Sequence, residues 1–262
     1  MKHSGFVIGI QARLRSTRLP GKVLFPLGNA RHNSLSLMIR RIRANQLLRD
    51  VPLFILTTDQ ECDNAIVDFS NQIGIRSIQG SEDDVLSRYA ELASSTQAPH
   101  IIRLTADCPL IDPSEIARLI DLHVKERSDY TTNTFPDSLT PDGFDVEIIS
   151  SPTLLQSHKA ASLPSEREHV TFHIAANRDL KVVRSPMTIT DAYMRLTLDT
   201  SWDLKLISLL IDSLENADTA TAQEIVAAYT KHNLGTIVSH LEKNAGWKTA
   251  FEADLEYNNC SI

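Results

Sequence analysis

The sequence predicts an α/β fold in which helices cover both faces of a mostly parallel β-sheet. Short runs rich in β-branched residues alternate along the chain with longer stretches of helical periodicity. The 262 residues are 42% hydrophobic, which is enough apolar surface for a large buried core. No repeat or low-complexity tract interrupts them. We therefore expect a single three-layer domain over residues 1–262 that binds ligands beyond the carboxyl ends of its strands.

Four strand-helix units are expected in the first half of the chain. Their strands are predicted at residues 6–10, 52–57, 73–78 and 100–105. Their helices are predicted at residues 34–48, 61–72, 83–95 and 113–126. The start of the last helix is clearly marked, because Asp112 can serve as N-cap and Pro113 occupies the first helical position. Residues 105–110 are then a strand-to-helix turn.

The regular alternation is lost between about residues 129 and 190. Turn-forming residues are frequent there, and two strands are predicted, at residues 144–149 and 180–184. This pattern is typical of an insertion or flap on the domain. The last part of the chain returns to helices, which are expected at residues 201–214, 221–231 and 236–245.

Composition excludes several classes of protein. The 26 Lys and Arg are outnumbered by 33 Asp and Glu, so a broad surface for nucleic-acid backbones is not expected. No segment approaches the roughly 20 apolar residues of a membrane helix, and the apolar run at residues 6–10 is too short for a signal peptide. The three cysteines, Cys62, Cys108 and Cys260, contain no Cys-x-x-Cys pair, which favours a reducing compartment. We expect a cytoplasmic protein with no nucleic-acid or membrane partner.

The loop after the first predicted strand concentrates positive charge. Four cations stand within ten residues that contain no acid: Arg13, Arg15, Arg18 and Lys22. Ser16 adds a hydroxyl and Gly21 allows close backbone approach, so the loop suits an anionic polyphosphate. It is not a Walker A loop, because Ser16 stands where a glycine is required and Val23 where Ser or Thr is required. The alternative interpretation is a solvated basic turn.

Two aspartates near the ends of predicted strands are candidate metal ligands. Asp107 precedes a Cys-Pro pair and should project from its turn toward the cationic loop. Asp199 ends another β-like run, while Thr200 and Asp203 have the spacing of a capping box, which assigns Asp203 to a helix start. A carboxylate that faces a polyphosphate needs a cation between them, and this argues for Mg²⁺. The alternative for Asp107 is a turn-forming aspartate.

His169 and His173 are a further candidate metal pair. Their i, i+4 spacing is that of a zinc metalloprotease helix, but the glutamate that should follow the first histidine is missing. A zinc hydrolase is therefore an alternative hypothesis, and ordinary helix histidines are the more frequent explanation of such a pair.

Six ordered motifs resemble the cytidylyltransferases that make CMP-activated sugars, the superfamily of CMP-ketodeoxyoctonate and CMP-sialic acid synthetases. The motifs lie at residues 11–24, 80–88, 103–113, 142–147, 167–171 and 198–204. The closest similarity is to the spore-coat polysaccharide, SpsF-like, branch. Two departures from the sialic-acid and ketodeoxyoctonate enzymes fit this branch: Gln11 replaces a proline, and Thr105 and Ala106 stand where glycine is usual.

The resemblance implies a Rossmann-like domain of the nucleotide-diphosphosugar transferase type, dimeric through the irregular middle segment. It implies that CTP donates CMP to a sugar or sugar acid for surface polysaccharide or glycoconjugate synthesis. Lys22, Arg13, Asp107 and Asp199 would be catalytic, and Mg²⁺, for which Mn²⁺ could substitute, would be held by the two aspartates. The implied triphosphate ligands are Arg13, Ser16, Lys22 and also Arg18, and the residues near the nucleoside are Ser81 and Arg88.

The same resemblance places acceptor contacts in the middle segment and its neighbourhood. The expected residues are Asp145, Glu147, His169 and Arg195. The general base stays open among the first three, and the alternation Asp145-Val-Glu147-Ile equally fits a strand with outward-facing acids. Two broader alternatives also stay open, namely another nucleotide or a phosphonate acceptor, and a non-catalytic module that binds nucleotide sugars.

Overall fold

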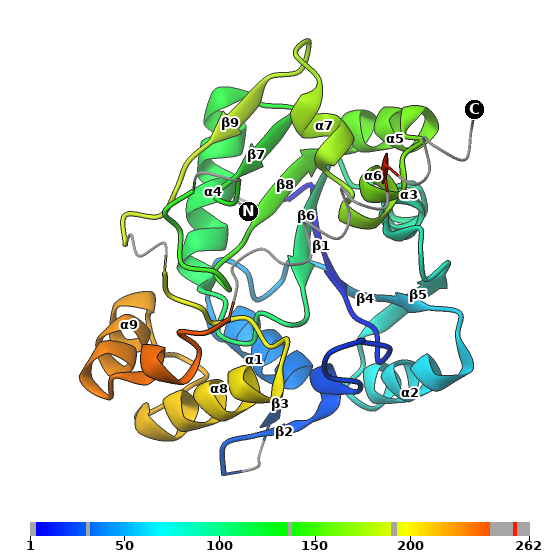
Figure 1. Ribbon diagram of the computed structural model, residues 1–262. Helices are drawn as coiled ribbons and strands as arrows, with labels where there is room; N and C mark the ends of the chain where they lie inside the picture. Colours follow the sequence, from blue (N-terminus) through cyan, green and yellow to red (C-terminus); the bar gives the residue numbers. More distant parts are fainter. Residues whose placement is uncertain (1–3, 30–31, 136–137, 190–192, 242–253, 256–262) are drawn as a thin grey trace.

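A seven-stranded sheet forms the centre of the molecule in the computed structural model, which describes residues 4–29, 32–135, 138–189, 193–241 and 254–255 (Figure 1). Its strand order is β5-β4-β1-β6-β8-β7-β9. The strands are β1 Phe6–Gln11, β4 Leu53–Thr58, β5 Arg76–Gly80, β6 His100–Thr105, β7 Tyr130–Thr132, β8 Glu147–Ser150 and β9 Val182–Arg184. Only β8 runs antiparallel to its neighbours in this sheet. The predicted mostly parallel α/β sheet is thus confirmed.

Helices cover both faces of this sheet. The α-helices are α1 Ser34–Ala44, α2 Asn64–Gln72, α3 Val85–Thr96, α4 Pro113–Glu126, α5 Ser151–Ala160, α6 Pro164–His169, α7 Phe172–Ala176, α8 Ser201–Ser213 and α9 Ala222–Lys231. Short 3₁₀ helices are η1 Lys22–Leu24, η2 Glu61–Asp63 and η3 Leu234–Ile237, and β2 Pro26–Leu27 pairs with β3 His32–Asn33 in a small second sheet. Apolar side chains of α1, α2 and α4 form one core layer with the sheet, and those of α3, α5 and α7 form the other.

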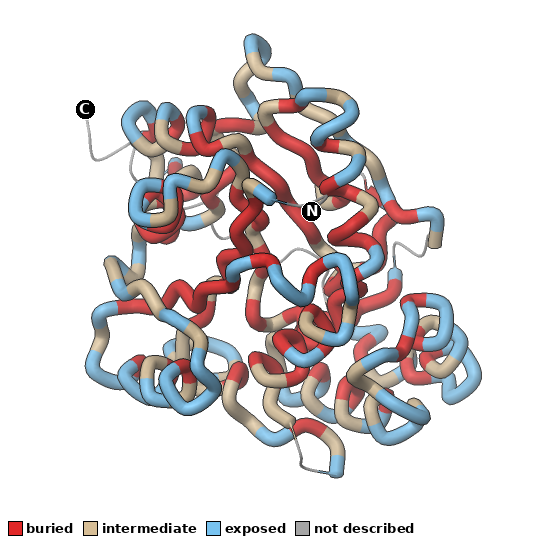
Figure 2. The backbone as a smooth tube through the Cα atoms, turned by 180° about the vertical axis from the view of Figure 1, so that it is seen from behind, coloured by how far each residue is buried: buried red, intermediate tan, exposed pale blue. Residues whose placement is uncertain are grey.

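The alternation of side chains along β1 shows why both faces need helices. Phe6, Ile8 and Ile10 enter the core with α1 and α4, whereas Val7 enters the core with α3. Parallel strands of this kind are buried on both sides and read as continuous apolar runs. Figure 2 shows the buried chain running through the centre and the exposed chain on the outer helices. A third apolar cluster joins α8 and α9 to Leu37 of α1.

The structure corrects several predicted boundaries. The strand expected at residues 73–78 is β5, which starts later, because α2 continues to Gln72 and Gly74 takes a positive φ of 70° in the turn after it. The helix expected at residues 236–245 is wrong in its described part, where η3 ends at Ile237 and turns follow to residue 241. The rest of that prediction lies outside the described residues.

The middle segment, residues 129–190, belongs to the main sheet more fully than predicted. It supplies β7, β8 and β9, together with α5, α6 and α7. The two predicted strands correspond to β8 and β9, while β7 and the three helices were missed. The three-residue strand β7 is too short for a periodic signal, and its pairing with β8 and β9 is made over a long sequence distance.

None of the helices within the described ranges is long and apolar enough to cross a membrane. Cys62 is exposed and Cys108 is buried, and both carry free thiols. Cys260 lies outside the described residues.

A buried histidine of α4, which lies beside the amino end of β6, should make stability depend on pH. His123 Nδ1 lies 2.9 Å from Thr131 Oγ1, and its Nε2 lies 3.1 Å from His100 Nδ1. Burial, followed by the neighbouring His100, lowers the pKa of His123 to about 4. Because the unfolded chain binds this proton more readily, the contribution is complete above about pH 6.5 and is lost as the pH falls toward 4.

We expect this histidine to cost up to about 1.4 kcal/mol of unfolding free energy per pH unit below pH 6.5. Urea unfolding at pH 7.5 and 5.5 measures the loss, and His123→Gln should show a smaller loss because Gln does not titrate. Equal losses in the two proteins would contradict the assignment.

Candidate active site

The structure joins the cationic loop to both candidate metal aspartates through one lysine. Lys22 Nζ lies 2.8 Å from Asp107 Oδ2 and 2.8 Å from Asp199 Oδ1. Lys22 opens η1 directly after Gly21, whose φ of 78° is a left-handed conformation that suits glycine. Asp107 follows β6, and Asp199 stands two residues before α8. Three segments that are far apart in sequence therefore converge beyond the carboxyl end of the sheet.

Local hydrogen bonds hold these segments in place. The Leu198 backbone N–H donates to the carbonyl of Asp107 at 2.8 Å. The predicted capping box is confirmed, since the Asp203 backbone N–H donates to Thr200 Oγ1 at 3.3 Å and Asp203 Oδ2 accepts from the Thr200 N–H at 2.8 Å. Asp112 likewise caps α4 by accepting from the Ser114 N–H. The carboxylate of Asp199 is thus not used as the helix cap.

Asp199 is the centre of an ion-pair network. Its Oδ2 lies 3.1 Å from Arg18 Nη2 and 3.0 Å from Arg195 Nη2. Arg195 Nε also pairs with Asp203 at 2.7 Å, and Arg195 Nη1 lies 3.5 Å from Asp142. Arg195 therefore orients Asp199. The resemblance implied a contact between Arg195 and the acceptor, and did not imply this second role.

The carboxylates of Asp107 and Asp199 already hold one positive charge between them, as a cation site requires. Burial by itself would lower the pKa of Lys22, but Asp107 and Asp199 raise it above its ordinary value, so the ammonium carries its charge between them. Their oxygens already converge on one positive centre. Within the described residues no group of three or more His, Cys, Asp or Glu side chains could hold a metal. Two carboxylates with phosphate oxygens completing the shell are a usual arrangement for Mg²⁺.

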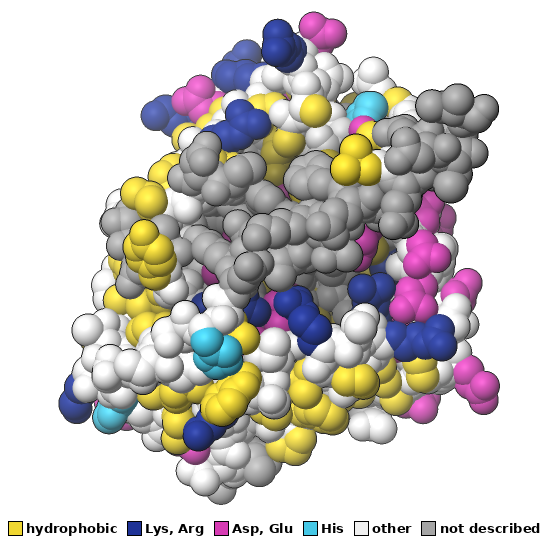
Figure 3. Space-filling model, viewed as in Figure 1, with side chains coloured by type: hydrophobic (Ala, Val, Ile, Leu, Met, Phe, Trp, Pro, Cys, Tyr) yellow, Lys and Arg dark blue, Asp and Glu magenta, His cyan; other side chains and the backbone are white. Residues whose placement is uncertain are grey.

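The other loop cations spread along the edge of the site. Arg13 lies 3.6 Å from Glu82 and 3.7 Å from Glu168, while Arg15 lies 3.3 Å from Glu82. Ser16 Oγ accepts from the Leu19 N–H at 3.3 Å, which closes a turn inside the loop. Basic and acidic side chains lie side by side near the middle of the face shown in Figure 3. The cations of this loop are therefore matched by carboxylates from several elements.

On the side of α3, polar atoms are buried without a partner. Arg88 is 3% exposed, and its Nη1 donates to the Leu56 carbonyl at 3.3 Å. Its Nε and Gln11 Oε1, which lies on the same face of the sheet, have no hydrogen-bond partner in the described part of the chain, and neither has Thr57 Oγ1 on the opposite face. Burial lowers the pKa of Arg88. Ser81, by contrast, is exposed, and its Oγ accepts from the Asp84 N–H at the start of α3.

Gln11 and Thr57 were not among the predicted site residues. Both stand at or next to the carboxyl ends of strands, β1 and β4, which is the edge of the sheet where ligands are expected. A polar residue at one of the last two positions of an apolar strand is the signal that could have found them.

On the side of β8, Glu147 lies inside the protein and not on an outward face. It is 4% exposed and accepts hydrogen bonds from Arg103, from the hydroxyl of Tyr130 and from Thr171 Oγ1 at 2.7 Å. The alternative of outward-facing acids is therefore wrong for Glu147. Three donors therefore hold the carboxylate of Glu147 in place.

Asp145 precedes Glu147 by two residues and lies toward the carboxyl end of β6, which is followed by Asp107. Its Oδ2 accepts from the Gly143 N–H at 3.1 Å. Burial raises the pKa of Asp145, and the charges of Glu147 and Asp107 contribute in the same direction. Asp145 therefore lies within electrostatic reach of both the metal candidate and the β8 network.

His169 ends α6 and stacks on Phe172, with ring centroids 4.5 Å apart. Burial, followed by the charge of Arg103, lowers the pKa of His169 to about 4, so the ring is neutral at pH 7. His173 belongs to α7 and contacts Glu166 at 3.0 Å. Because Val170 interrupts the helix with a φ of 63°, the two histidines do not share one helix face, and the zinc-helix alternative is wrong.

Comparison with known proteins identifies the family to which this geometry belongs. The family model described as cytidylyltransferase matches residues 7–200. The chain belongs to the cytidylyltransferase family. It is therefore a nucleotidyltransferase, and the converging Lys22, Asp107 and Asp199 lie within the matched range.

Individual relatives agree with this family. The chain is 32% identical over 230 residues to the spore coat polysaccharide biosynthesis protein SpsF of Bacillus subtilis, with 85% of this chain and 93% of that protein covered. A cytidylyltransferase structure from Leptospira borgpetersenii has a TM-score of 0.82 at 28% identity, covering 92% and 99% of the two chains. A CMP:2-keto-3-deoxy-manno-octonic acid synthetase complexed with CTP shares the fold, with a TM-score of 0.55 at 17% identity over 79% and 98%.

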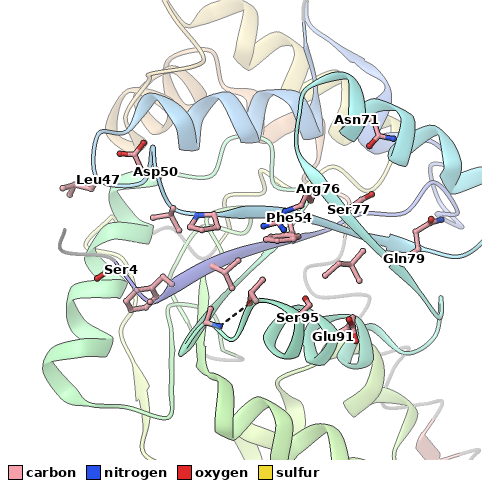
Figure 4. A pocket seen from close by; sticks show the side chains of 18 of the residues that line it. Ser4, Leu47, Asp50, Phe54, Asn71, Arg76, Ser77, Gln79, Glu91 and Ser95 are labelled. Carbon is pink, nitrogen blue, oxygen red and sulfur yellow. Dashed lines mark hydrogen bonds between the residues drawn. The ribbon is translucent and has the colours of Figure 1, made fainter.

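A groove in this cytidylyltransferase lies away from Lys22, Asp107 and Asp199. It has a volume of about 1280 Å³ and surrounds the amino ends of β1 and β4 (Figure 4). Arg76 lies over the ring of Phe54 at 4.3 Å in this groove, and Glu91 and Ser95 line it from α3. Lys22, Asp107 and Asp199 do not line this groove.

Proposed function

We propose that this cytidylyltransferase transfers CMP from CTP to a hydroxyl of a sugar or sugar acid and releases pyrophosphate. The convergence of Lys22, Asp107 and Asp199 in a cytidylyltransferase fold carries the proposal. The name of the SpsF relative supports a role in making surface polysaccharide or glycoconjugate. The CTP bound to the octonic acid synthetase supports the choice of nucleotide.

The reaction is an in-line displacement at the α-phosphorus of CTP. A bond forms between the acceptor oxygen and the α-phosphorus, and the bond to the bridging oxygen breaks, so that pyrophosphate leaves with the electron pair. The acceptor hydroxyl gives its proton to a general base, for which Asp145, Glu147 and His169 are the candidates. Positioning and charge compensation supply most of the catalysis in such transfers. Arg13, Arg18 and Lys22 offer the positive charge for the triphosphate, and Ser16 offers a hydroxyl at the same loop.

Asp107 and Asp199 would hold Mg²⁺, or Mn²⁺ in its place. A fold relative from Mycobacterium tuberculosis has been solved in complex with manganese. When bound, the ion would polarise the α-phosphate and balance the charge of the leaving group. Lys22 would then turn from the aspartates toward the phosphates, which its flexible chain allows.

The acceptor residues of the proposal are Asp145, Glu147, His169 and Arg195. Glu147 and Arg195 act mainly by fixing the positions of neighbouring side chains.

Since CTP is made in the cytoplasm, we also propose that compartment, which fractionation of cells would test. We also propose a homodimer that forms through residues 129–190. Sedimentation velocity that shows only a monomer would refute the dimer.

Nucleotide choice tests the proposed function. The unpartnered Arg88 Nε is a donor and Gln11 Oε1 is an acceptor, which matches the ring acceptor and the amino donor on the edge of cytosine. Uracil reverses this pattern and leaves buried groups unpaired, at about 1–3 kcal/mol each. We therefore expect CTP to exceed UTP in kcat/KM by about one to two orders of magnitude, with ATP and GTP poorer still.

Pyrophosphate release measured with the four nucleotides, Mg²⁺ and a panel of acceptors gives the comparison. Equal use of UTP, or a preference for a purine, would refute the assignment to CTP. The Gln11→Glu variant is a matched control for the base edge, because it keeps the size and the acceptor oxygen while adding a charge near the triphosphate.

A further inference from the structure

A strained turn at Val170 separates α6 from α7. Val170 has a φ of 63° and a ψ of −50°, and the Thr171 N–H donates to the carbonyl of His169 at 2.5 Å. These features define a γ-turn of the rare, strained kind, and a positive φ is strongly disfavoured for a β-branched residue. The Val170 side chain is fully buried in the core that contains α3 and α5. The surrounding packing therefore imposes this conformation, and residues held in this way gather at functional sites.

The turn fixes the side chains on either side of Val170. Thr171 Oγ1 donates to Glu147 at 2.7 Å, which ties the turn to β8. The ring of His169 stacks on Phe172 with an interplanar angle of 14°, so its plane is set. Its Nε2 is buried and has no hydrogen-bond partner in the described part of the chain. Buried polar atoms without a partner are rare, so this nitrogen is left for a ligand.

His169 lies between the cationic loop and the paired strands β6 and β8. Glu168, the residue before it, contacts Arg13 of the cationic loop at 3.7 Å. On the other side, the charge of Arg103 in β6 acts on the His169 ring, and Arg103 stands four residues before Asp107. The ring is therefore next to the loop that is expected to bind the triphosphate, on the side where the acceptor is expected.

Charged groups from four segments act on the His169 ring. Burial makes the largest contribution and lowers the pKa of His169 to about 4, and the charges of Arg103 and Arg13 act in the same direction. Glu147 and Asp254 oppose them. The other charged side chains of α6 have partners on α3 and α7, namely Arg167 with Asp84 and Glu166 with His173. The ring is neutral at pH 7 and can accept a proton at Nε2, but in the free protein it is a weak base.

The triphosphate of CTP changes this balance of charge. In the proposed function, Arg13 exchanges its carboxylate partners for phosphate oxygens. Its positive charge is then cancelled, and the carboxylate of Glu168 beside the ring is released from its ion pair. Both changes favour the protonated imidazole, because negative charge near a histidine raises its pKa. Bound CTP should therefore make His169 a stronger base.

We propose that His169 is the catalytic base of the reaction and takes the proton of the acceptor hydroxyl at its Nε2 atom. This inference rests on the proposed function and names one of its three candidates for the general base. As the acceptor oxygen bonds to the α-phosphorus, its proton passes to Nε2, and pyrophosphate leaves with the electron pair of the broken bond. The imidazolium then gives its proton to water. Val170 and Thr171 are positioning residues, since they orient the ring without contacting the substrate.

The titration of His169 by NMR tests the effect of the nucleotide. Its ring resonances, assigned by comparison with His169→Gln, are followed against pH in the free protein and with saturating CTP and Mg²⁺, in the absence of acceptor. We expect CTP to raise the pKa of His169 by at least about one unit, as a nearby change of one charge does. In Arg13→Gln the pKa should be higher in the free protein, and CTP should raise it less. A pKa that CTP leaves unchanged or lowers would overturn the inference.

The pH dependence of turnover tests the proton transfer itself. Pyrophosphate release is measured with saturating CTP and 2-keto-3-deoxy-manno-octonic acid, or with whichever acceptor of the panel reacts fastest. His169→Gln should lower kcat by about 100- to 10,000-fold and remove the fall of kcat at low pH, while its Kd for CTP by calorimetry stays within about twofold. His232→Gln, at an exposed histidine after α9, is the matched control and should keep kcat within about twofold. A variant His169→Gln that keeps its turnover, or keeps the same fall at low pH, would overturn the inference.

Asp254→Asn tests the role through a charge and not through the ring. Asp254 accepts from the N–H and the hydroxyl of Ser165, at 3.0 and 2.6 Å, and its charge raises the pKa of His169. Its loss should therefore move the fall of kcat to lower pH, which a merely structural role would not do. A fall that stays in place or moves to higher pH would contradict the inference. If His169→Gln fails to fold, as thermal unfolding would show, this variant and the titration of the unaltered protein decide the question. Failure of the unaltered protein to bind CTP would instead refute the proposed function.

Discussion

Asp107→Asn is expected to lower kcat by about 100- to 1000-fold, the usual cost of removing a group that stabilises transition-state charge. The amide has nearly the volume of the carboxylate but no charge, so it removes half of the proposed cation site. Lys22 would keep Asp199 as its remaining partner, and the fold should survive because Asp107 is held by its backbone carbonyl as well. Pyrophosphate release at saturating CTP over a range of Mg²⁺ concentrations measures the effect.

Asp179→Asn is the matched control, since Asp179 is an exposed aspartate in the turn before β9. It should keep kcat within about twofold, because surface substitutions away from special features have small effects. If Asp107→Asn keeps most of its metal-dependent turnover, Asp107 does not hold the ion, and the turn-forming alternative for this residue is favoured.

Lys22→Met should affect both turnover and stability. The change keeps the length of the side chain and removes the charge, so we expect kcat/KM for CTP to fall by about 100-fold. A solvated loop lysine would have little effect on folding, but Lys22 is 9% exposed and pairs with two carboxylates. Its loss leaves two like charges close together, which should cost about 1–3 kcal/mol of unfolding free energy without Mg²⁺.

Thermal unfolding with and without Mg²⁺ separates the two effects. A divalent ion between Asp107 and Asp199 can replace the missing ammonium, so Mg²⁺ should stabilise Lys22→Met more than the unaltered protein. Lys159→Met, at an exposed lysine of α5, is the control and should match the unaltered protein in both measurements. Equal stabilisation by Mg²⁺ in Lys22→Met and in the unaltered protein would contradict a shared cation site.

Local patterns in the sequence predicted the parts of the site one at a time. The capping roles of Asp112 and Asp203 follow from spacings of two to three residues, and the structure confirms both. The βα rhythm located β1, β4 and β6 because strands buried on both faces need continuous apolar runs. The charge of the loop around Lys22 was also visible, since it lies within ten residues.

Contacts between distant segments could not be predicted from these patterns. Alternation showed that Asp145 and Glu147 share a face, but only the pairing of β8 with β6 puts Glu147 against Arg103 and makes that face an interior one. The short strand β7 and the end of the chain beyond η3 lack a periodic signal, so the prediction failed there.

The sequence by itself determined the fold class, the cationic loop and the two aspartates at strand ends, because each depends on residues near one another in the chain. Only the tertiary structure decided that Lys22 joins Asp107 and Asp199, from which it is separated by 85 and 177 residues. It also decided that Glu147 cancels the charge of Arg103. The physical reason is that an ion pair depends on distance and burial in three dimensions, and both arise from strand order and helix packing that no local spacing encodes.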